Sequence, residues 1–147
     1  MIVGLNPNCR QEVKRWPHFA ELADRLELEG HAVWFAGIPR MQCSSNAMGT
    51  YFSANLKTLM MLMRKEFDIF VSVNSPLLQV AIAMRITTIA LIGGIPARMV
   101  VPFNNPLVRY AEDPGLHSHS RELRMGEISV AWVLELIRLA SLAMERQ

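Results

Sequence analysis

The chain has 147 residues, of which 51% are hydrophobic and 19% are charged, and its formal net charge is +2. This composition excludes an intrinsically disordered chain, and the length fits one domain that buries about two thirds of the surface its unfolded form exposes. The small net charge provides no bulk field to attract nucleic acid or an anionic membrane, so we expect neither partner. No run reaches the roughly 18 apolar residues of a membrane span. The first residues indicate a strand rather than a signal peptide, which favours a soluble cytoplasmic protein.

Apolar segments alternate with amphipathic ones along the chain. Strands are predicted at Met1–Leu5, Ala32–Ala36, Ile69–Val73 and Thr87–Ile92, with a candidate fifth at Leu107–Ala111. Helices are predicted between Pro17 and Gly30, from Asn55 to about Lys65, from Ser75 to about Arg85, and over about 129–146. Continuous apolar strands alternating with helices are typical of a parallel sheet covered on both faces. The sequence therefore predicts an α/β fold, with a single Rossmann-like domain over 1–147.

Two of the predicted helices have notable apolar faces. Leu56, Leu59, Met60 and Met63 share one face of the second helix, and we expect them to point inward. The last helix is apolar around most of its circumference, which predicts burial on more than one side. Such a helix either lies deep in the domain or meets a partner, and we favour a homodimer contact through it.

Cysteine and histidine give no sign of a metal centre. Cys9 and Cys43 are too few for a disulfide framework, and the chain has no CxxC motif. His117 and His119 have no other Cys or His at ligand spacing, so a flexible surface loop is the simpler interpretation. We expect no bound metal and no cofactor.

The loops that follow the strands are the candidate ligand sites, because parallel sheets bind ligands beyond the carboxyl ends of their strands. The first such loop carries Arg10, Lys14 and Arg15, which suit phosphate oxygens. From composition alone, a solvated basic loop is the favoured interpretation of these cations. The loop 93–98 adds Arg98 after two glycines that permit a close approach to the backbone.

Ser75 begins the third predicted helix and has two possible roles. The free amides and the positive end of the helix dipole form an anion site, to which the Ser75 hydroxyl can donate. Alternatively, Ser75 only caps its own helix. Pro76 lacks an N–H group, so one potential phosphate donor is missing there.

Several of these segments occur together in one known family. They are Val3-Gly-Leu-Asn-Pro-Asn8, Lys14-Arg-Trp-Pro17, Ala32-Val-Trp-Phe-Ala-Gly37, the stretch 59–68, and Asn74-Ser-Pro-Leu-Leu-Gln-Val-Ala-Ile-Ala83. In this order they resemble the heptosyltransferases, which are family 9 glycosyltransferases. The resemblance covers about 1–111 and implies the C-terminal, nucleotide-sugar-binding half of a two-domain GT-B glycosyltransferase.

The resemblance also implies a set of ligand-binding residues. The family's lysine before Trp-Pro contacts the diphosphate of ADP-heptose, and Lys14 matches it. Asn8, Cys9 and Arg10 correspond to the small polar segment ahead of that lysine. The family motif D-[ST]-G-x-x-H-x-A falls on Asn74, Ser75, Pro76, Gln79 and Ala81, with Leu77 in the same helix start. Of the motif's defined positions, only Ser75 and Ala81 keep the family residue, so a carboxylate, an amide donor and a titratable ring are lost.

Three functions agree with this sequence. The first is non-catalytic binding or sequestration of an ADP-containing small molecule, either a nucleotide sugar or an ADP-ribose-type signal. The resemblance implies that the family's catalytic carboxylate lies in the other half, which favours a protein without its own activity. The second function is the donor-binding subunit of a glycosyltransferase that needs a partner chain or a dimer. The third is a degenerate domain used as a structural or interaction module.

Overall fold

The computed structural model describes residues 1–36, 55–102, 104–117, 122, 124–146. Five strands are present there: β1 (Ile2–Asn6), β2 (Ala32–Phe35), β3 (Ile69–Val73), β4 (Thr87–Ile92) and β5 (Val108–Glu112). The α-helices are α1 (Phe19–Leu28), α2 (Leu56–Glu66), α3 (Pro76–Ala83) and α4 (Val130–Met144). Short 3₁₀ turns are η1 (Glu12–Lys14), η2 (Ala97–Met99), η3 (Pro114–His117) and η4 (Met125–Glu127). These bounds confirm the predicted strands and helices, including the candidate fifth strand.

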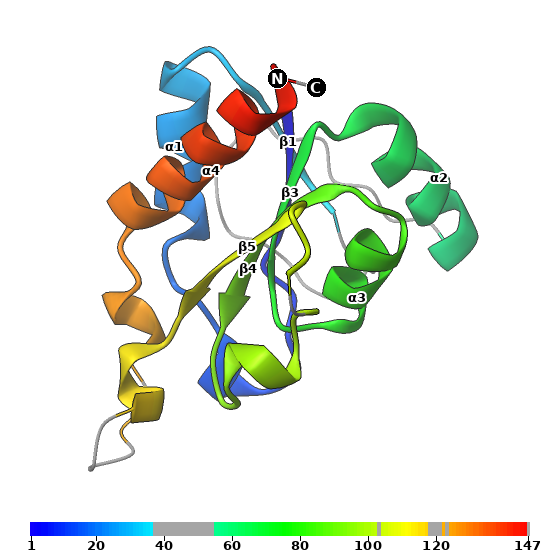
Figure 1. Ribbon diagram of the computed structural model, residues 1–147. Helices are drawn as coiled ribbons and strands as arrows, with labels where there is room; N and C mark the ends of the chain where they lie inside the picture. Colours follow the sequence, from blue (N-terminus) through cyan, green and yellow to red (C-terminus); the bar gives the residue numbers. More distant parts are fainter. Residues whose placement is uncertain (37–54, 103, 118–121, 123, 147) are drawn as a thin grey trace.

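The strands form one parallel sheet in the order β2-β1-β3-β4-β5. β1 is an interior strand, with Val3 opposite Val33 of β2 on one side and Ile69 of β3 on the other. All strands therefore end at the same edge, which lies at the bottom of Figure 1 together with the loops that follow β1 and β4.

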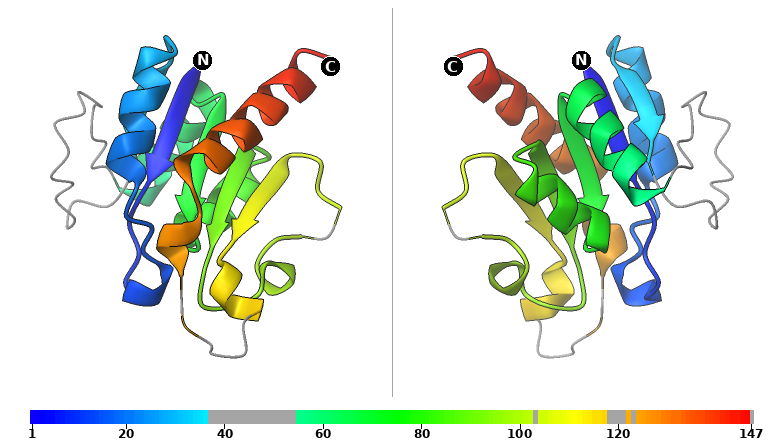
Figure 2. Two further views of the ribbon diagram at one scale, coloured as in Figure 1. Left: turned by 90° about the vertical axis from the view of Figure 1, so that its left-hand side faces the viewer. Right: turned by 90° about the vertical axis from the view of Figure 1, so that its right-hand side faces the viewer.

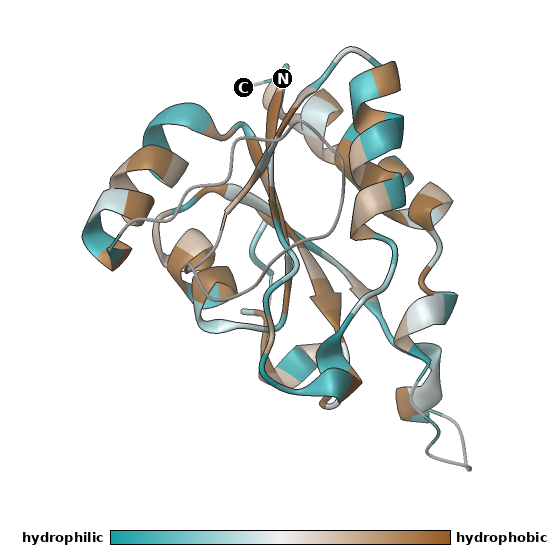
Figure 3. Cartoon of the chain, turned by 180° about the vertical axis from the view of Figure 1, so that it is seen from behind, coloured by the Kyte–Doolittle hydropathy of each residue, from teal (hydrophilic) through white to brown (hydrophobic). Residues whose placement is uncertain are grey.

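Helices cover both faces of this sheet, as Figures 1 and 2 show. α1 and α4 pack on one face, where side chains such as Leu22 and Ile137 share a core with Leu5 and Val71. α2 and α3 cover the other face over a second core around Phe70. The central strands are brown, for hydrophobic residues, in Figure 3, whereas the helices carry both brown and the teal of hydrophilic residues. The predicted α/β fold with a parallel sheet flanked by helices is confirmed.

The helix ends follow the local sequence. Asn55, Ser75 and Ser129 each accept a hydrogen bond from a backbone amide three residues later, which satisfies a free amide at the helix start. Gly30 follows α1 with φ +83°, a left-handed conformation that glycine adopts without steric cost.

The expectation for the inward face of α2 was partly wrong. Leu59 and Met63 are fully buried, but Leu56 is 51% exposed because the inward stripe of α2 begins three residues later. α4 buries one stripe, including Val133 and Ile137, and leaves Trp132 43% exposed. Of the two alternatives for α4, a position deep in the domain is therefore wrong, and a contact with a partner stays a prediction. Among the described helices, none combines the length and the apolar content that a bilayer crossing requires.

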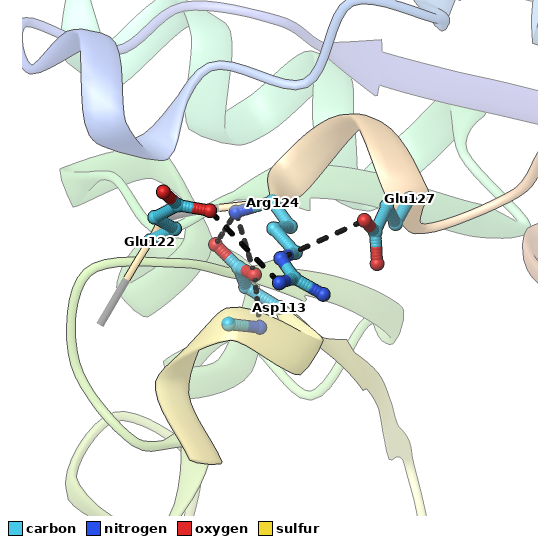
Figure 4. Close-up of polar contacts among 5 residues, drawn as sticks. Asp113, Glu122, Arg124 and Glu127 are labelled. Atoms are coloured by element: carbon cyan, nitrogen blue, oxygen red, sulfur yellow. Dashed lines mark hydrogen bonds and ion pairs between the residues drawn. The ribbon is translucent and has the colours of Figure 1, made fainter. Parts of the chain in front are cut away.

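The connection between β5 and α4 is held by a buried carboxylate (Figure 4). Asp113 is fully buried, and its Oδ1 accepts from the backbone amides of Gly115 at 2.7 Å and Arg124 at 2.9 Å. Its Oδ2 accepts from the Arg124 amide, also at 2.9 Å. The Arg124 guanidinium lies between Glu122, at 4.0 Å, and Glu127, at 3.7 Å. Of the predicted loop around His117 and His119, His117 ends η3, and His119 lies outside the described residues.

Candidate functional site

From β1, the chain adds β2 on one side of the sheet and β3 on the other, so the strand order switches sides between β1 and β3. A buried polar network lies at this switch point. Asn6, the last residue of β1, is fully buried and donates from Nδ2 to Ser72 Oγ and Ser75 Oγ, both at 2.9 Å. Asn6 Oδ1 accepts from the backbone amide of Asn8 at 3.1 Å. These bonds join the loop after β1 to the start of α3. In open α/β sheets, such a switch point is where ligands bind.

The Ser75 hydroxyl is occupied by this network. Its oxygen accepts from Asn6 and from the amide of Leu78, at 3.4 Å, and it lies 3.3 Å from Ser72 Oγ. Ser72 Oγ already donates to the carbonyl of Val73. The hydrogen of Ser75 is therefore directed to Ser72. The capping interpretation of Ser75 describes its role in the structure.

Lys14 lies against the glycines that follow β4. A Cβ added to Gly94 would be 3.7 Å from both Cγ and Cε of Lys14, so the lysine stem passes over a residue without a side chain. Gly94 has φ +83°, which favours glycine at this turn. A Cβ on Gly93 would lie 2.9 Å from the carbonyl oxygen of Val13. The structure thus brings two of the predicted ligand loops together.

The positive charges of these loops are largely uncompensated. Lys14, Arg10 and Arg98 form no ion pair with the residues that the structure describes, and Arg10 and Arg98 are exposed. Arg15 lies 4.0 Å from Glu12, but both side chains are exposed, so this pair contributes little. An anion at this edge would meet cations that are free to bind it.

The loop after β4 is anchored on two sides. Glu112 Oε1 accepts from the amide of Ala97 at 2.8 Å, which fixes η2 to the end of β5. Gln79 Nε2 donates to the carbonyl of Val100 at 3.1 Å from α3. Gln79, predicted as a ligand residue, thus holds the loop that carries Arg98. His117 Nε2 lies 3.1 Å from the second oxygen of Glu112.

The other predicted site residues, Cys9, Leu77 and Asn74, are buried or half-buried. Cys9 is buried in the core beneath α1, and its thiol donates to the carbonyl of Gln11 at 3.4 Å. Burial raises the pKa of the Cys9 thiol, and the nearby charges of Arg15 and Lys14 oppose this only in part. Leu77 is buried in the core around Phe70, so only its backbone faces the helix start. Asn74 is half-buried, and its backbone amide donates a hydrogen bond to the carbonyl of Leu91.

Asn8 has an unusual environment for a polar residue. Its side-chain Nδ2 is buried and has no hydrogen-bond partner among the residues that the structure describes. A buried unpaired donor costs about 1–3 kcal/mol. This group lies in the loop between the Asn6 network and Lys14.

Sequence reasoning missed Asn6, Ser72 and Glu112. Asn6 and Ser72 are polar residues at or near the ends of otherwise apolar strands, and this is the signal that marks them. Glu112 gave no such signal, because its partner is a backbone amide 15 residues away. Within the described segments, no group of three or more His, Cys, Asp or Glu side chains is arranged to hold a metal ion.

Comparison with known proteins gives a consistent result. Residues 1–114 match the family model "Glycosyltransferase family 9 (heptosyltransferase)". Among solved structures, Escherichia coli ADP-heptose LPS heptosyltransferase II has 24% identity and a TM-score of 0.79, over 98% of this chain and 47% of that one. A family 9 glycosyl transferase from Veillonella parvula has 16% identity and a TM-score of 0.82, over 97% of this chain and 46% of that one.

A third similar structure is E. coli heptosyltransferase WaaC with ADP-2-deoxy-2-fluoro heptose. It has 18% identity and a TM-score of 0.73, over 93% of this chain and 42% of that one. No curated protein matches the chain. The chain spans about half the length of these solved relatives, and at such identities their likeness shows the fold. The family model covers most of the sequence, and the chain therefore belongs to glycosyltransferase family 9, the heptosyltransferase family.

Proposed function

We propose that this protein binds an ADP-containing small molecule, a nucleotide sugar or an ADP-ribose-type nucleotide, at the edge where β1 and β3 end. The observation that carries the proposal is the meeting of Lys14 with the Gly93–Gly94 turn, beside the buried network of Asn6. Heptosyltransferases solved with ADP, with ADP-heptose or with ADP-2-deoxy-2-fluoro heptose share this fold, which supports a nucleoside diphosphate as the ligand class.

We propose further that the chain by itself does not turn this ligand over. A glycosyl transfer needs a carboxylate within reach of the acceptor as general base. Glu112 and Asp113, which end β5, both accept hydrogen bonds from backbone amides. Their oxygens are thus committed to holding loops in place, which favours sequestration over catalysis.

Lys14→Ala tests the site directly. We expect ADP affinity to fall by about 1.5–3 kcal/mol, because the variant removes a charge-assisted hydrogen bond to the diphosphate. Isothermal titration of ADP, ADP-heptose and ADP-ribose measures this change. Lys57→Ala is the matched control, since it removes the same charge from α2. Equal affinities of wild type and Lys14→Ala would remove Lys14 from the site, and no heat with any of the three ligands would contradict the proposed function.

A second candidate function is the donor-binding subunit of a two-chain glycosyltransferase. The observation that favours it is the match of residues 1–114 to the family 9 glycosyltransferase model. This function predicts transfer or hydrolysis of a nucleotide sugar once a chain carrying the acceptor half is added. Sequestration predicts an intact ligand in the same assay.

We also propose that α4 forms a homodimer contact, in a protein that works in the cytoplasm. Trp132, Leu139 and Leu142 leave an exposed apolar stripe along α4. The buried free thiol of Cys9 fits a reducing compartment.

Leu139→Glu is expected to convert such a dimer to monomer, raising its dissociation constant about tenfold or more, because a carboxylate would lose water in the contact. Sedimentation equilibrium measures this change, with Met61→Glu on the other face of the sheet as the control. A wild-type protein that stays monomeric at high concentration would refute the contact.

A further inference from the structure

α2 carries an open apolar groove on its outer side, away from the candidate nucleotide site. The groove has a volume of about 540 Å³ and is lined by Leu56, Lys57, Met60, Met61, Arg64 and Met84. This volume is within the range of sites for small molecules, about 300–1,000 Å³. None of its residues belongs to the loops that hold Lys14 and Arg98.

Core packing explains only part of the groove's apolar lining. α2 already fills the core with Leu59 and Met63, which are fully buried. Leu56 and Met61 lie outside that buried stripe, and Met61 is 66% exposed. Met84, at the end of α3, packs partly against the core around Phe70 and adds another thioether to the groove. Methionine side chains adapt to ligands of irregular shape, which makes such a surface suitable for a flexible chain.

Two cations flank the apolar floor. Lys57 and Arg64 are seven residues apart on α2, about 10 Å along the helix axis. Neither forms an ion pair with the residues that the structure describes, whereas the neighbouring Lys65 is paired with Glu66 at 3.0 Å. Their long side chains can cover an apolar ligand while the charged ends stay in water. An occupant of complementary charge would carry an anionic group at one end.

We infer that this groove binds a single-chain anionic amphiphile, with the alkyl chain against the methionines and the anionic head at Lys57 or Arg64. This site is separate from the proposed nucleotide site and does not depend on it. Burial of the chain supplies the apolar contribution to binding, about 25 cal/mol per Å² of apolar surface removed from water. The cations determine which head group is accepted.

Isothermal titration below the micellar concentration tests the inference, with decyl phosphate, decanoate and the uncharged decyl maltoside as probes. We expect wild type to bind both anionic probes at least tenfold more tightly than decyl maltoside. The two anionic arms distinguish a phosphate head from a carboxylate head. Met61→Glu should weaken decyl phosphate binding at least tenfold, and Arg64→Gln about fivefold.

Leu28→Glu is the matched control, because Leu28 is 83% exposed on α1, across the sheet from the groove. We expect it to bind decyl phosphate within twofold of wild type, and Met61→Glu to keep the wild-type affinity for ADP. Equal binding of all three probes, no binding of decyl phosphate by wild type, or binding only to vesicles that contain anionic lipid would each overturn the inference.

Discussion

Asp113→Asn should lower the free energy of unfolding by about 3 kcal/mol, although it changes few atoms. The carboxylate is fully buried and accepts hydrogen bonds from two backbone amides, that of Gly115 at Oδ1 and that of Arg124 shared between Oδ1 and Oδ2. An amide group would place an N–H₂ donor opposite one of these backbone donors, so at least one buried group would lose its partner. Urea unfolding, followed by circular dichroism, measures the change.

Glu122→Gln is the control for this experiment. It removes a charge from the same connection, but Glu122 is mostly exposed and lies 4.0 Å from Arg124. We expect a change within about 0.5 kcal/mol, as for other exposed ion pairs. Equal losses in the two variants would show that Asp113 acts through general charge rather than through its hydrogen bonds to the two backbone amides.

Gly93→Ala should affect both stability and ligand binding. The added Cβ would lie 2.5 Å from Sδ of Met125 and 2.9 Å from the carbonyl oxygen of Val13. The methionine end can rotate away, but the backbone of Val13 must shift. Crowding of this kind costs about 1–3 kcal/mol of stability. Because Lys14 follows Val13, we also expect ADP to bind about fivefold more weakly, a loss of about 1 kcal/mol.

Gly126→Ala separates this effect from that of any added methyl group. A Cβ on Gly126 would meet only Pro17 and His18, at 3.7 and 4.0 Å, which are ordinary contacts. We expect wild-type ADP affinity in this variant. If Gly93→Ala also kept that affinity while losing stability, the position of Lys14 would not depend on the glycine turn.

The fold was largely predictable because its signals are local. The strands β3 and β4 are mostly apolar and are buried at every position, as expected for strands covered on both faces. Asn55, Ser75 and Ser129 mark helix starts by their own chemistry. The inward face of α2 was predicted less well, because methionine and leucine occur all around this helix. Periodicity alone did not separate Leu56 from Leu59.

The candidate site was predictable only in part. The cationic loops and Lys14 are visible in sequence because their charges cluster after a strand. The roles of Gln79 and Glu112 depend on backbone groups 21 and 15 residues away, which no local pattern contains. Asp113 was hidden for the same reason, since its partners are amides rather than side chains of opposite charge. Such contacts arise only when the sheet has brought the loops together.

The position of β1 between β2 and β3 has a consequence for how the protein forms during synthesis. Val3 pairs with Val33 on one edge and with Ile69 on the other, 66 residues further along the chain. At about 5–20 residues per second, the second partner leaves the ribosome roughly 3–13 s after β1. During that interval, an apolar strand has one unpaired edge, a state prone to association with other chains. Sheets built from such distant pairings also fold slowly, so early protection of β1 is a requirement of this topology.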